Sequence, residues 1–262
     1  LTLYGDLDLS VIDELPPGRK PVLTHVRTEA DRSKVYQEVV SRLREGHQCY
    51  IVYPLVEESE KVEARAAKEM ASILQKTVFS AFKVGLLHGR LTSEEKDSVM
   101  QQFRRHDLDV LVATTVIEVG VDVPNATLMV IEHANRFGLS QLHQLRGRVG
   151  RGSNQSSCFL MSSEGSSSEA RQRLDIMQQT NDGFQISEKD LEIRGPGDFV
   201  GTKQSGLPRF HFANLVRDRV WLGRACRDAE QWLEEELQGG VESAHLKEIL
   251  SDWEHRFGLF HV

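Results

Sequence analysis

The chain has 262 residues, of which 39% are hydrophobic and 27% charged, and its formal net charge is -7. This is ordinary globular composition, long enough for one large domain or two small ones. The acidic balance argues against a polybasic binder, so any contact with nucleic acid must come from a local patch. Three cysteines without metal-binding spacing indicate reduced thiols rather than a disulfide framework or a zinc site. No leader pattern opens the sequence and no apolar run reaches about 18 residues, so we expect a cytoplasmic protein without a membrane partner.

Short apolar runs alternate with helical patterns between residues 21 and 162. The runs of strand length are 21–26, 49–54, 84–89, 109–114, 127–133 and 157–162. Helical periodicity covers 31–46, 60–76 and 92–105. Gly46 stands where a helix-ending glycine belongs, and Thr92 and Glu95 have the spacing of a capping box. This alternation predicts an α/β fold with a parallel, doubly wound sheet and helices on both faces.

In such a sheet, ligands bind beyond the carboxyl ends of the strands. Here those ends carry polar, functional-looking sequence, namely "YPLVEES", "LHGRL" and "ATTVIEVGVD". We therefore expect the site at this edge.

The pattern changes after residue 163. A serine-rich loop is followed by two short helical segments, 171–180 and 186–193, which could pair as a hairpin. The stretch "RGPGDFVGTKQSG" at 194–206 is too irregular for either period and predicts an extended loop. A last helix is expected at about 213–237. We divide the chain into four parts. Residues 1–20 hold a short N-terminal tail and a linker, 21–163 the sheet, 164–210 the helical hairpin and loop, and 211–262 the C-terminal helical segment.

One basic stretch stands out, "QLHQLRGRVGRGSNQ" at 141–155. Arginine recognises phosphate in a planar, bidentate way, and glycine lets the backbone approach a bulky anion. A helix through this stretch would place Gln144, Arg148 and Arg151 on one face, suited to a polyphosphate. From these residues alone, a solvated basic turn or a patch for nucleic-acid backbone is an equally good interpretation.

The order of motifs resembles that of superfamily 2 helicases. "QLRGRVGR" is similar to their arginine motif, "VATTVIEVGVDVPNA" to the preceding motif of the second RecA-like domain, and "LHGRL" to a DNA-facing motif. "DLEIRGPGDFVGTKQSG" resembles the translocation motif shared by RecG helicases and transcription-repair coupling translocases, and "GLPRFHFANLVRD" is closer to RecG. The resemblance covers nearly the whole chain and implies a RecA-like sheet followed by a helical hairpin, an extended loop and C-terminal helices.

The resemblance implies a nucleotide site. Arg148 and Arg151 would be arginine fingers that reach the γ-phosphate of ATP from across a cleft, and Gln144 would orient the attacking water or a finger. Gly120 and Asp122 would hold the ribose. The alternative for Asp122 is a turn-forming aspartate before Val-Pro.

The resemblance also implies contacts with DNA. Thr114 and Thr115 would donate to a DNA phosphate, although both could instead be β-branched strand residues. His88 and Arg90 lie in a loop that resembles a DNA-backbone contact, and the alternative for His88 is a structural role.

Residues of the glycine-rich loop would couple hydrolysis to movement. Arg194, Gly201 and Gln204 belong to the segment that resembles the translocation motif, and an ordinary surface loop is the alternative. The resemblance gives Arg146 no role, so we expect it to pair with an acid.

The chain contains neither a GxxxxGK[ST] loop nor a DExx box after a strand. The resemblance implies that an upstream RecA-like domain, of which 1–20 would be the tail and linker, binds most of ATP and Mg²⁺. A wedge domain elsewhere in the same protein would recognise branched DNA. We therefore expect the second motor half of a monomeric, ATP-dependent double-stranded DNA translocase that remodels stalled forks and Holliday junctions in recombination and repair.

Two alternatives remain open at this point. One is a transcription-repair coupling translocase, and the other is a non-catalytic RecA-like module that binds DNA or a protein.

Overall fold

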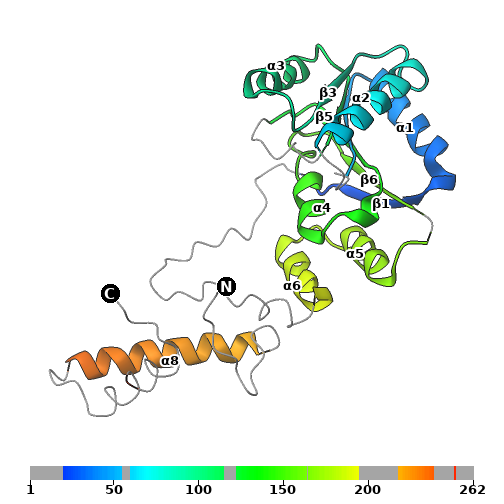
Figure 1. The fold of residues 1–262 in the computed structure, drawn as a ribbon. Helices are drawn as coiled ribbons and strands as arrows, with labels where there is room; N and C mark the ends of the chain where they lie inside the picture. Colours follow the sequence, from blue (N-terminus) through cyan, green and yellow to red (C-terminus); the bar gives the residue numbers. More distant parts are fainter. Residues whose placement is uncertain are drawn as a thin grey trace. The chain divides into compact units, whose positions relative to one another are not determined.

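The core of the protein is a parallel sheet of six strands, shown in Figure 1. A computed structural model describes residues 20–54, 60–114, 122–163, 165–194, 218–238 and 251. Contacts divide the chain into residues 1–187 and residues 188–262, which are described separately. The strands are β1 (Leu23–Thr28), β2 (Gln48–Val52), β3 (Val84–Leu87), β4 (Val110–Ala113), β5 (Ala126–Ile131) and β6 (Ser157–Ser162). Their order in the sheet is β1-β6-β5-β2-β4-β3.

Two helices cover one face of this sheet. They are α1 (Arg32–Arg44), which follows β1, and α2 (Glu60–Lys76), which follows β2. Val39 of α1 and Leu74 of α2 share a buried cluster with every second residue of the central strands, such as Ile51 and Val130. This alternation is what a strand covered on both faces requires.

The other face is covered by helices that follow later strands. These are α3 (Ser93–Arg104) and α4 (Leu139–Arg146), whose crossovers β3–α3–β4 and β5–α4–β6 run across the sheet in the opposite direction to β1–α1–β2. Right-handed crossovers therefore place them on the opposite face. The ring of Tyr50 in β2 packs 4.8 Å from that of Phe103 in α3. The parallel sheet with helices on both faces confirms the expected fold class.

Local sequence signals explain where these helices begin and end. Thr92 accepts a hydrogen bond from the Glu95 amide at 3.2 Å, while the Glu95 carboxylate accepts from the Thr92 amide at 2.8 Å, so the predicted capping box is confirmed. Gly46, just after α1, has a φ of +87° that favours glycine. The strands of the structure differ from the predicted runs by up to two residues at either end, the usual uncertainty of such boundaries.

Beyond the sheet, the expected short helices are present as α5 (Ser168–Gln179) and α6 (Gly183–Arg194), with short 3-10 turns at η1 (Glu29–Asp31) and η3 (Ala134–Arg136) earlier in the chain. The helix expected at about 213–237 corresponds to α8 (Arg219–Gln238) within the described residues. The predicted loop lies outside them, apart from Arg194 at the end of α6. The proposed divisions at 163 and 210 stay predictions.

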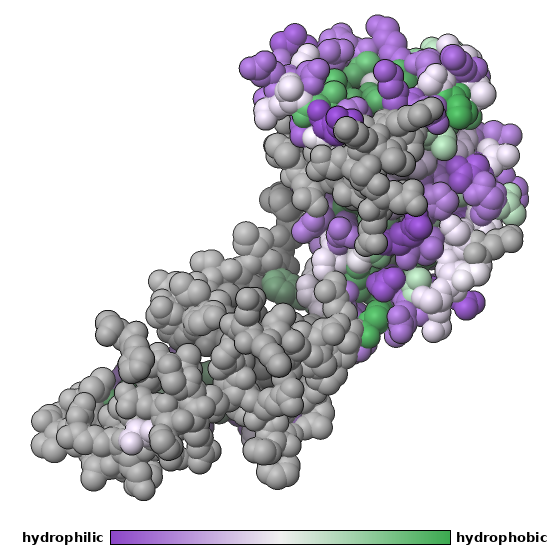
Figure 2. All heavy atoms as spheres, viewed as in Figure 1, coloured by the Kyte–Doolittle hydropathy of each residue, from purple (hydrophilic) through white to green (hydrophobic). Residues whose placement is uncertain are grey.

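The surface is largely polar where the structure describes it. On the face shown in Figure 2, hydrophilic side chains predominate over the described part of residues 20–187, and hydrophobic ones form small separate patches. Among the described helices, none is long and apolar enough to cross a membrane.

Candidate nucleotide and DNA site

The predicted site residues gather along one edge of the sheet and in the turn after α4. Because all six strands are parallel, their carboxyl ends share an edge, where His88 follows β3 and Thr114 follows β4. Asp122 stands on the path from β4 to β5, and Arg148 and Arg151 follow α4. Gly120, Thr115, Gly201 and Gln204 lie outside the described residues.

The arginine stretch is a helix followed by a turn, which corrects the expected helical face. The helix α4 ends at Arg146, where the Gly147 amide bonds the His143 carbonyl at 3.0 Å and the Arg148 amide bonds that of Leu145 at 3.0 Å. Gly150 then takes a φ of +74°, a left-handed conformation that favours glycine. Gln144 is therefore exposed on the helix, while Arg148 and Arg151 belong to the turn.

Two glycines of this turn allow close packing, Gly150 against a side chain and Gly152 against the backbone. A Cβ at Gly150 would lie 2.8 Å from Val22 Cγ2, and one at Gly152 would lie 2.6 Å from the carbonyl oxygen of Pro124. Real Cβ atoms do not approach so closely, so only glycine fits at either position without a shift. The turn is thus pressed against the segment before β5, which contains Asp122.

This packing brings two predicted site residues together. Nη1 of Arg151 forms an ion pair with Oδ1 of Asp122, and its Nε donates to the Gly147 carbonyl at 3.0 Å. The Asp122 side chain keeps 64% of its surface exposed and the Arg151 side chain 28%. An arginine held in this way at the surface can present its remaining donors to an anion.

Arg148 lies in the same electrostatic environment. Burial raises the pKa of Tyr50 to about 12, and the positive charges of Arg148 and Arg151 oppose that rise. Arg148 and Arg151 lie three residues apart in this turn. Two cations close together form a binding region for a polyanion.

Arg146 has a different environment, which corrects the expectation that it pairs with an acid. Its side chain is buried, and its Nη1 donates to Thr24 Oγ1 at 3.3 Å and to the carbonyls of Met177 and Thr180 at 2.8 Å each. Its Nη2 lies 3.1 Å from His143 Nδ1, which must accept because a guanidinium only donates.

The acceptors of Arg146 stand at the end of α5. Backbone carbonyls there carry the negative end of the helix dipole and satisfy a cation. No carboxylate among the described residues pairs with it. Burial lowers the pKa of Arg146.

The residues expected to contact DNA carry two polar atoms without partners. His88 Nδ1 and Thr114 Oγ1 are buried and form no hydrogen bond, although the Thr114 amide donates to the Leu87 carbonyl at 3.1 Å. Burial lowers the pKa of His88, and the charge of Arg90 lowers it further. Arg90 is exposed. Unpartnered buried atoms are costly, and their position at adjacent strand ends suits a ligand that would hydrogen-bond to them.

Sequence reasoning missed a charged cluster at the end of β5. The carboxylate of Glu132 is completely buried and accepts two hydrogen bonds from Arg32, at 2.7 and 2.9 Å, and one from the Tyr36 hydroxyl at 2.8 Å. Burial raises the pKa of Tyr36, with a further contribution from Glu132. The signal that could have found the cluster is an acidic residue ending the otherwise apolar run "TLMVIE".

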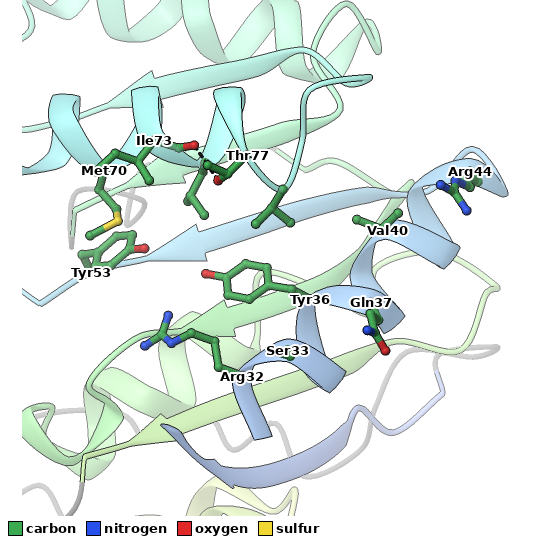
Figure 3. A pocket seen from close by; sticks show the side chains of 12 residues that line it. Arg32, Ser33, Tyr36, Gln37, Val40, Arg44, Tyr53, Met70, Ile73 and Thr77 are labelled. Atoms are coloured by element: carbon green, nitrogen blue, oxygen red, sulfur yellow. Dashed lines mark hydrogen bonds between the residues drawn. The ribbon is translucent and has the colours of Figure 1, made fainter. Parts of the chain in front are cut away.

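A groove of about 700 Å³ lies beside this cluster, between α1 and α2. Figure 3 shows Tyr53 and Met70 together at one end, Tyr36 across from them and Arg44 at the other end. None of the predicted site residues lines it. The groove therefore adds nothing to the nucleotide or DNA site.

Metal binding has no counterpart in the described part of the chain. Within it, no three His, Cys, Asp or Glu side chains come close enough together to hold an ion. The described residues therefore provide no cluster of such side chains that could hold Mg²⁺.

Two family descriptions match the sequence. The helicase conserved C-terminal domain matches residues 31–153, and domain 3, C-terminal, of ATP-dependent DNA helicase RecG matches residues 180–251. ATP-dependent DNA helicase RecG of Synechocystis sp. is 55% identical over 90% of the chain, and that of Bacillus subtilis is 50% identical over 87%. The chain spans 28% and 33% of the length of these two relatives.

A solved structure agrees with these matches. The structure of RecG bound to a three-way DNA junction superimposes with a TM-score of 0.66 at 50% identity, covering 84% of this chain and 28% of that one. The arginine turn (residues 147–152), the parallel sheet and the C-terminal match are consistent with one family. The chain belongs to the RecG helicases, of which it spans about a third.

Proposed function

We propose that this chain is the second motor half of an ATP-dependent DNA helicase that moves on double-stranded DNA and remodels branched structures such as stalled forks and Holliday junctions. The observation that carries the proposal is the arginine turn, where Arg151 pairs with Asp122 and Arg148 shares its electrostatic environment. Family membership supplies the context, since the matched relatives are ATP-dependent DNA helicases.

The arginine turn would complete a nucleotide site from one side. Arg148 and Arg151 would stabilise the charge that builds on the transferred phosphoryl group, which is the main catalytic task in phosphoryl transfer. Exposed Gln144 would orient the attacking water or a finger, and Asp122 with Gly120 would hold the ribose. Most contacts with ATP and Mg²⁺ would come from an upstream RecA-like domain.

The carboxyl edge of the sheet would face the DNA backbone. His88 and Thr114 offer buried polar atoms that a phosphate or its bound water could satisfy, and Arg90 adds an exposed charge. Thr115 would extend this contact. Such contacts position the protein without reading sequence, which suits recognition of branched DNA by shape. The relative solved on a three-way junction supports a branched partner, and a separate wedge domain would select the junction.

Helix α4 contacts α5 and also approaches the start of α6. Arg146 holds the last turn of α5, and a Cβ at Gly183, the first residue of α6, would lie 3.0 Å from His143 Nε2. A movement of the arginine turn would therefore displace both α5 and α6. From α6 it would pass to the glycine-rich loop, where Arg194, Gly201 and Gln204 would couple hydrolysis to translocation.

The match of residues 180–251 to RecG domain 3 favours this proposal over a transcription-repair coupling translocase. We further propose a monomer that acts in the cytoplasm. Two of the three cysteines are buried, and all three are free, as a reducing compartment allows.

The test compares the 262-residue chain with the intact protein that contains it. ATP hydrolysis is measured for both, with and without a three-way DNA junction. We expect DNA-stimulated hydrolysis from the intact protein alone, because the chain supplies only one side of the site. Robust hydrolysis by the chain would contradict the half-site, and an intact protein that binds junctions without hydrolysing ATP would favour a non-catalytic binding module.

A further inference from the structure

The groove between α1 and α2 is walled by one stripe of side chains from each helix. The stripe of α1 has residues four apart, and that of α2 has residues three and four apart, so both are continuous along their helices. At a rise of about 1.5 Å per residue, the α1 stripe is about 18 Å long, enough for about three turns of another helix. The stripes are Arg32, Tyr36, Val40 and Arg44 on α1 and Met70, Ile73, Leu74 and Thr77 on α2.

The groove exposes apolar surface to water. Ile73 lines it and leaves 53% of its surface exposed. The partly buried apolar side chains that also line it pack on the core cluster beneath and belong to Val40, Tyr53, Met70 and Val78. An exposed isoleucine beside a concave apolar floor is suited to docking of further apolar side chains.

Several polar groups of the groove are already engaged within the protein. The Tyr36 hydroxyl and the Arg32 guanidinium donate to the buried Glu132 carboxylate. The Thr77 hydroxyl donates to the Ile73 carbonyl at 2.7 Å. An extended segment lying here would need partners for its backbone amides and carbonyls, which these side chains no longer offer. A helix satisfies its backbone internally, so the groove suits a helix with an apolar face.

One end of the groove carries a cation that can take a partner. Arg44, at the end away from Tyr53 and Met70 in Figure 3, is exposed and pairs with no carboxylate among the described residues. Arg32, by contrast, is engaged by Glu29 and Glu132. Charge complementarity therefore favours one carboxylate on the occupant, placed at the Arg44 end.

The family's proteins contain enough further sequence to cover this groove from within the same molecule, because the chain spans only 28% and 33% of two RecG relatives. We propose that the α1–α2 groove is the docking site of an amphipathic helix from the part of the intact protein outside this chain, with apolar side chains against Tyr53, Met70 and Ile73 and a carboxylate at Arg44. The docked helix holds the second motor domain on the sheet face opposite α4. This inference rests on the length of the relatives and not on the arginine fingers, so either can fail without the other.

The test measures access to the groove in the purified intact protein, without nucleotide or DNA. Ile73→Cys and Gln37→Cys place a thiol in the groove. Ser72→Cys and Glu38→Cys are the matched controls, at neighbouring exposed positions that do not line it. Alkylation by N-ethylmaleimide is followed at each cysteine by peptide mass spectrometry. The groove thiols should react at least about 10-fold more slowly than their controls, because the docked helix must first open. Gln37→Cys keeps Ile73, so its protection does not depend on loss of that apolar contact.

Charge reversal tests the carboxylate of the occupant. In the Gln37→Cys protein, Arg44→Glu should raise the alkylation rate about 3- to 10-fold, because two like charges then meet at that end of the groove. Lys34→Glu is the matched control, since Lys34 is an exposed residue of α1 outside the groove, and it should leave the rate unchanged. An Arg44→Glu rate equal to that of the Gln37→Cys protein would overturn the carboxylate.

Cross-linking identifies the occupant. A photoreactive maleimide on Glu38→Cys, beside the groove, should link to a peptide outside the 262 residues with apolar side chains at helical spacing. Equal alkylation rates at groove and control positions would overturn the inference. Protection lost on dilution would assign the groove to a second copy, and a cross-link within the 262 residues would show that the chain covers its own groove. Either result would overturn the inference as well.

Discussion

Three arginines within six residues have two different environments. Arg146 is buried and donates hydrogen bonds to Thr24, His143 and the end of α5, whereas Arg151 is at the surface and pairs with the exposed carboxylate of Asp122. The buried side chain supports the fold, and a catalytic role is proposed for the surface one. A motif that looks uniform in sequence therefore places its cations in different environments.

The difference begins where α4 ends. Up to Arg146, the helix faces the core and α5, so a side chain on that face must find acceptors inside the protein. After Gly147 the chain leaves the helix, and there Arg148 is partly exposed and Arg151 exposed, while Val149 between them is buried. Position relative to the helix end thus decides which arginine is available to a ligand.

The largest expected effect concerns the surface arginines. In the intact protein, Arg148→Ala or Arg151→Ala should lower kcat for ATP hydrolysis by a factor of about 10³ to 10⁵, the range found for arginine fingers. Affinity for a three-way junction should stay close to that of the parent protein, because neither side chain is expected at the DNA. Steady-state kinetics and a junction-binding titration on the same preparation measure both.

If either variant instead weakened DNA binding and left hydrolysis intact, the arginine turn would belong to the DNA interface and not to the nucleotide site.

The second prediction concerns the glycine-rich loop, which we propose transmits movement from the arginine turn. Arg194→Ala or Gln204→Ala in the intact protein should abolish fork unwinding while ATP hydrolysis stays within about tenfold, or 1.4 kcal/mol in barrier. The reason is that hydrolysis needs the cleft alone, whereas movement needs its closure to be transmitted. Both activities are measured on one branched substrate. Parallel loss of the two would place these residues in the nucleotide site or the fold.

The third prediction concerns Arg146 itself. Arg146→Ala removes a buried cation and leaves the carbonyls of Met177 and Thr180 without its two 2.8 Å bonds. We expect the free energy of unfolding to fall by about 2–4 kcal/mol. Urea denaturation of the 262-residue chain measures this, with Arg148→Ala as the matched control expected within about 0.5 kcal/mol of the parent.

Arg146→Lys keeps the charge but loses the planar fork, so its free energy of unfolding should lie between those of the parent and Arg146→Ala. Equal midpoints for Arg146→Ala and the parent would show that the contacts with α5 do not stabilise the fold.

Much of the sheet could be predicted because its signals are local. The run 157–162 has the strand bounds of β6, and the helix 60–76 has those of α2. Thr92 and Glu95 mark the start of α3, because each side chain forms a hydrogen bond with the other residue's backbone amide. These elements depend on residues close in sequence, so pattern and propensity are sufficient for them.

The site could be predicted only in part, because its geometry depends on contacts distant in sequence. Spacing suggested that Arg148 and Arg151 continue the helix of Gln144, but the helix ends two residues before Arg148, and the glycines that follow pack closely against Val22 and Pro124. The buried Glu132 with Arg32 and Tyr36 was missed for the same reason, since its partners are about a hundred residues away in the chain.

The smallest expected effect concerns the packing of the arginine turn, which is tested by comparing alanine substitutions at two of its glycines. Gly152→Ala would put a methyl group 2.6 Å from the Pro124 carbonyl oxygen, a backbone atom that cannot rotate away. We expect a loss of about 1–3 kcal/mol in the free energy of unfolding, as for an overpacked core site. A lower kcat in the intact protein should accompany it, because separating the two segments also separates Arg151 from Asp122.

Gly147→Ala is the matched control in the same turn. Gly147 has a φ of -65°, which alanine adopts readily, and its Cβ position lies 3.3 Å from the nearest atom, the Gln144 carbonyl oxygen. Its effect on unfolding should stay below about 1 kcal/mol, since loss of chain entropy in the unfolded state offsets the mild crowding. Urea denaturation of the chain and ATPase kinetics of the intact protein check both variants. If Gly152→Ala matched Gly147→Ala in both measurements, the backbone contact with Pro124 would not hold the finger in place, and the arginine turn would owe its position to side chains alone.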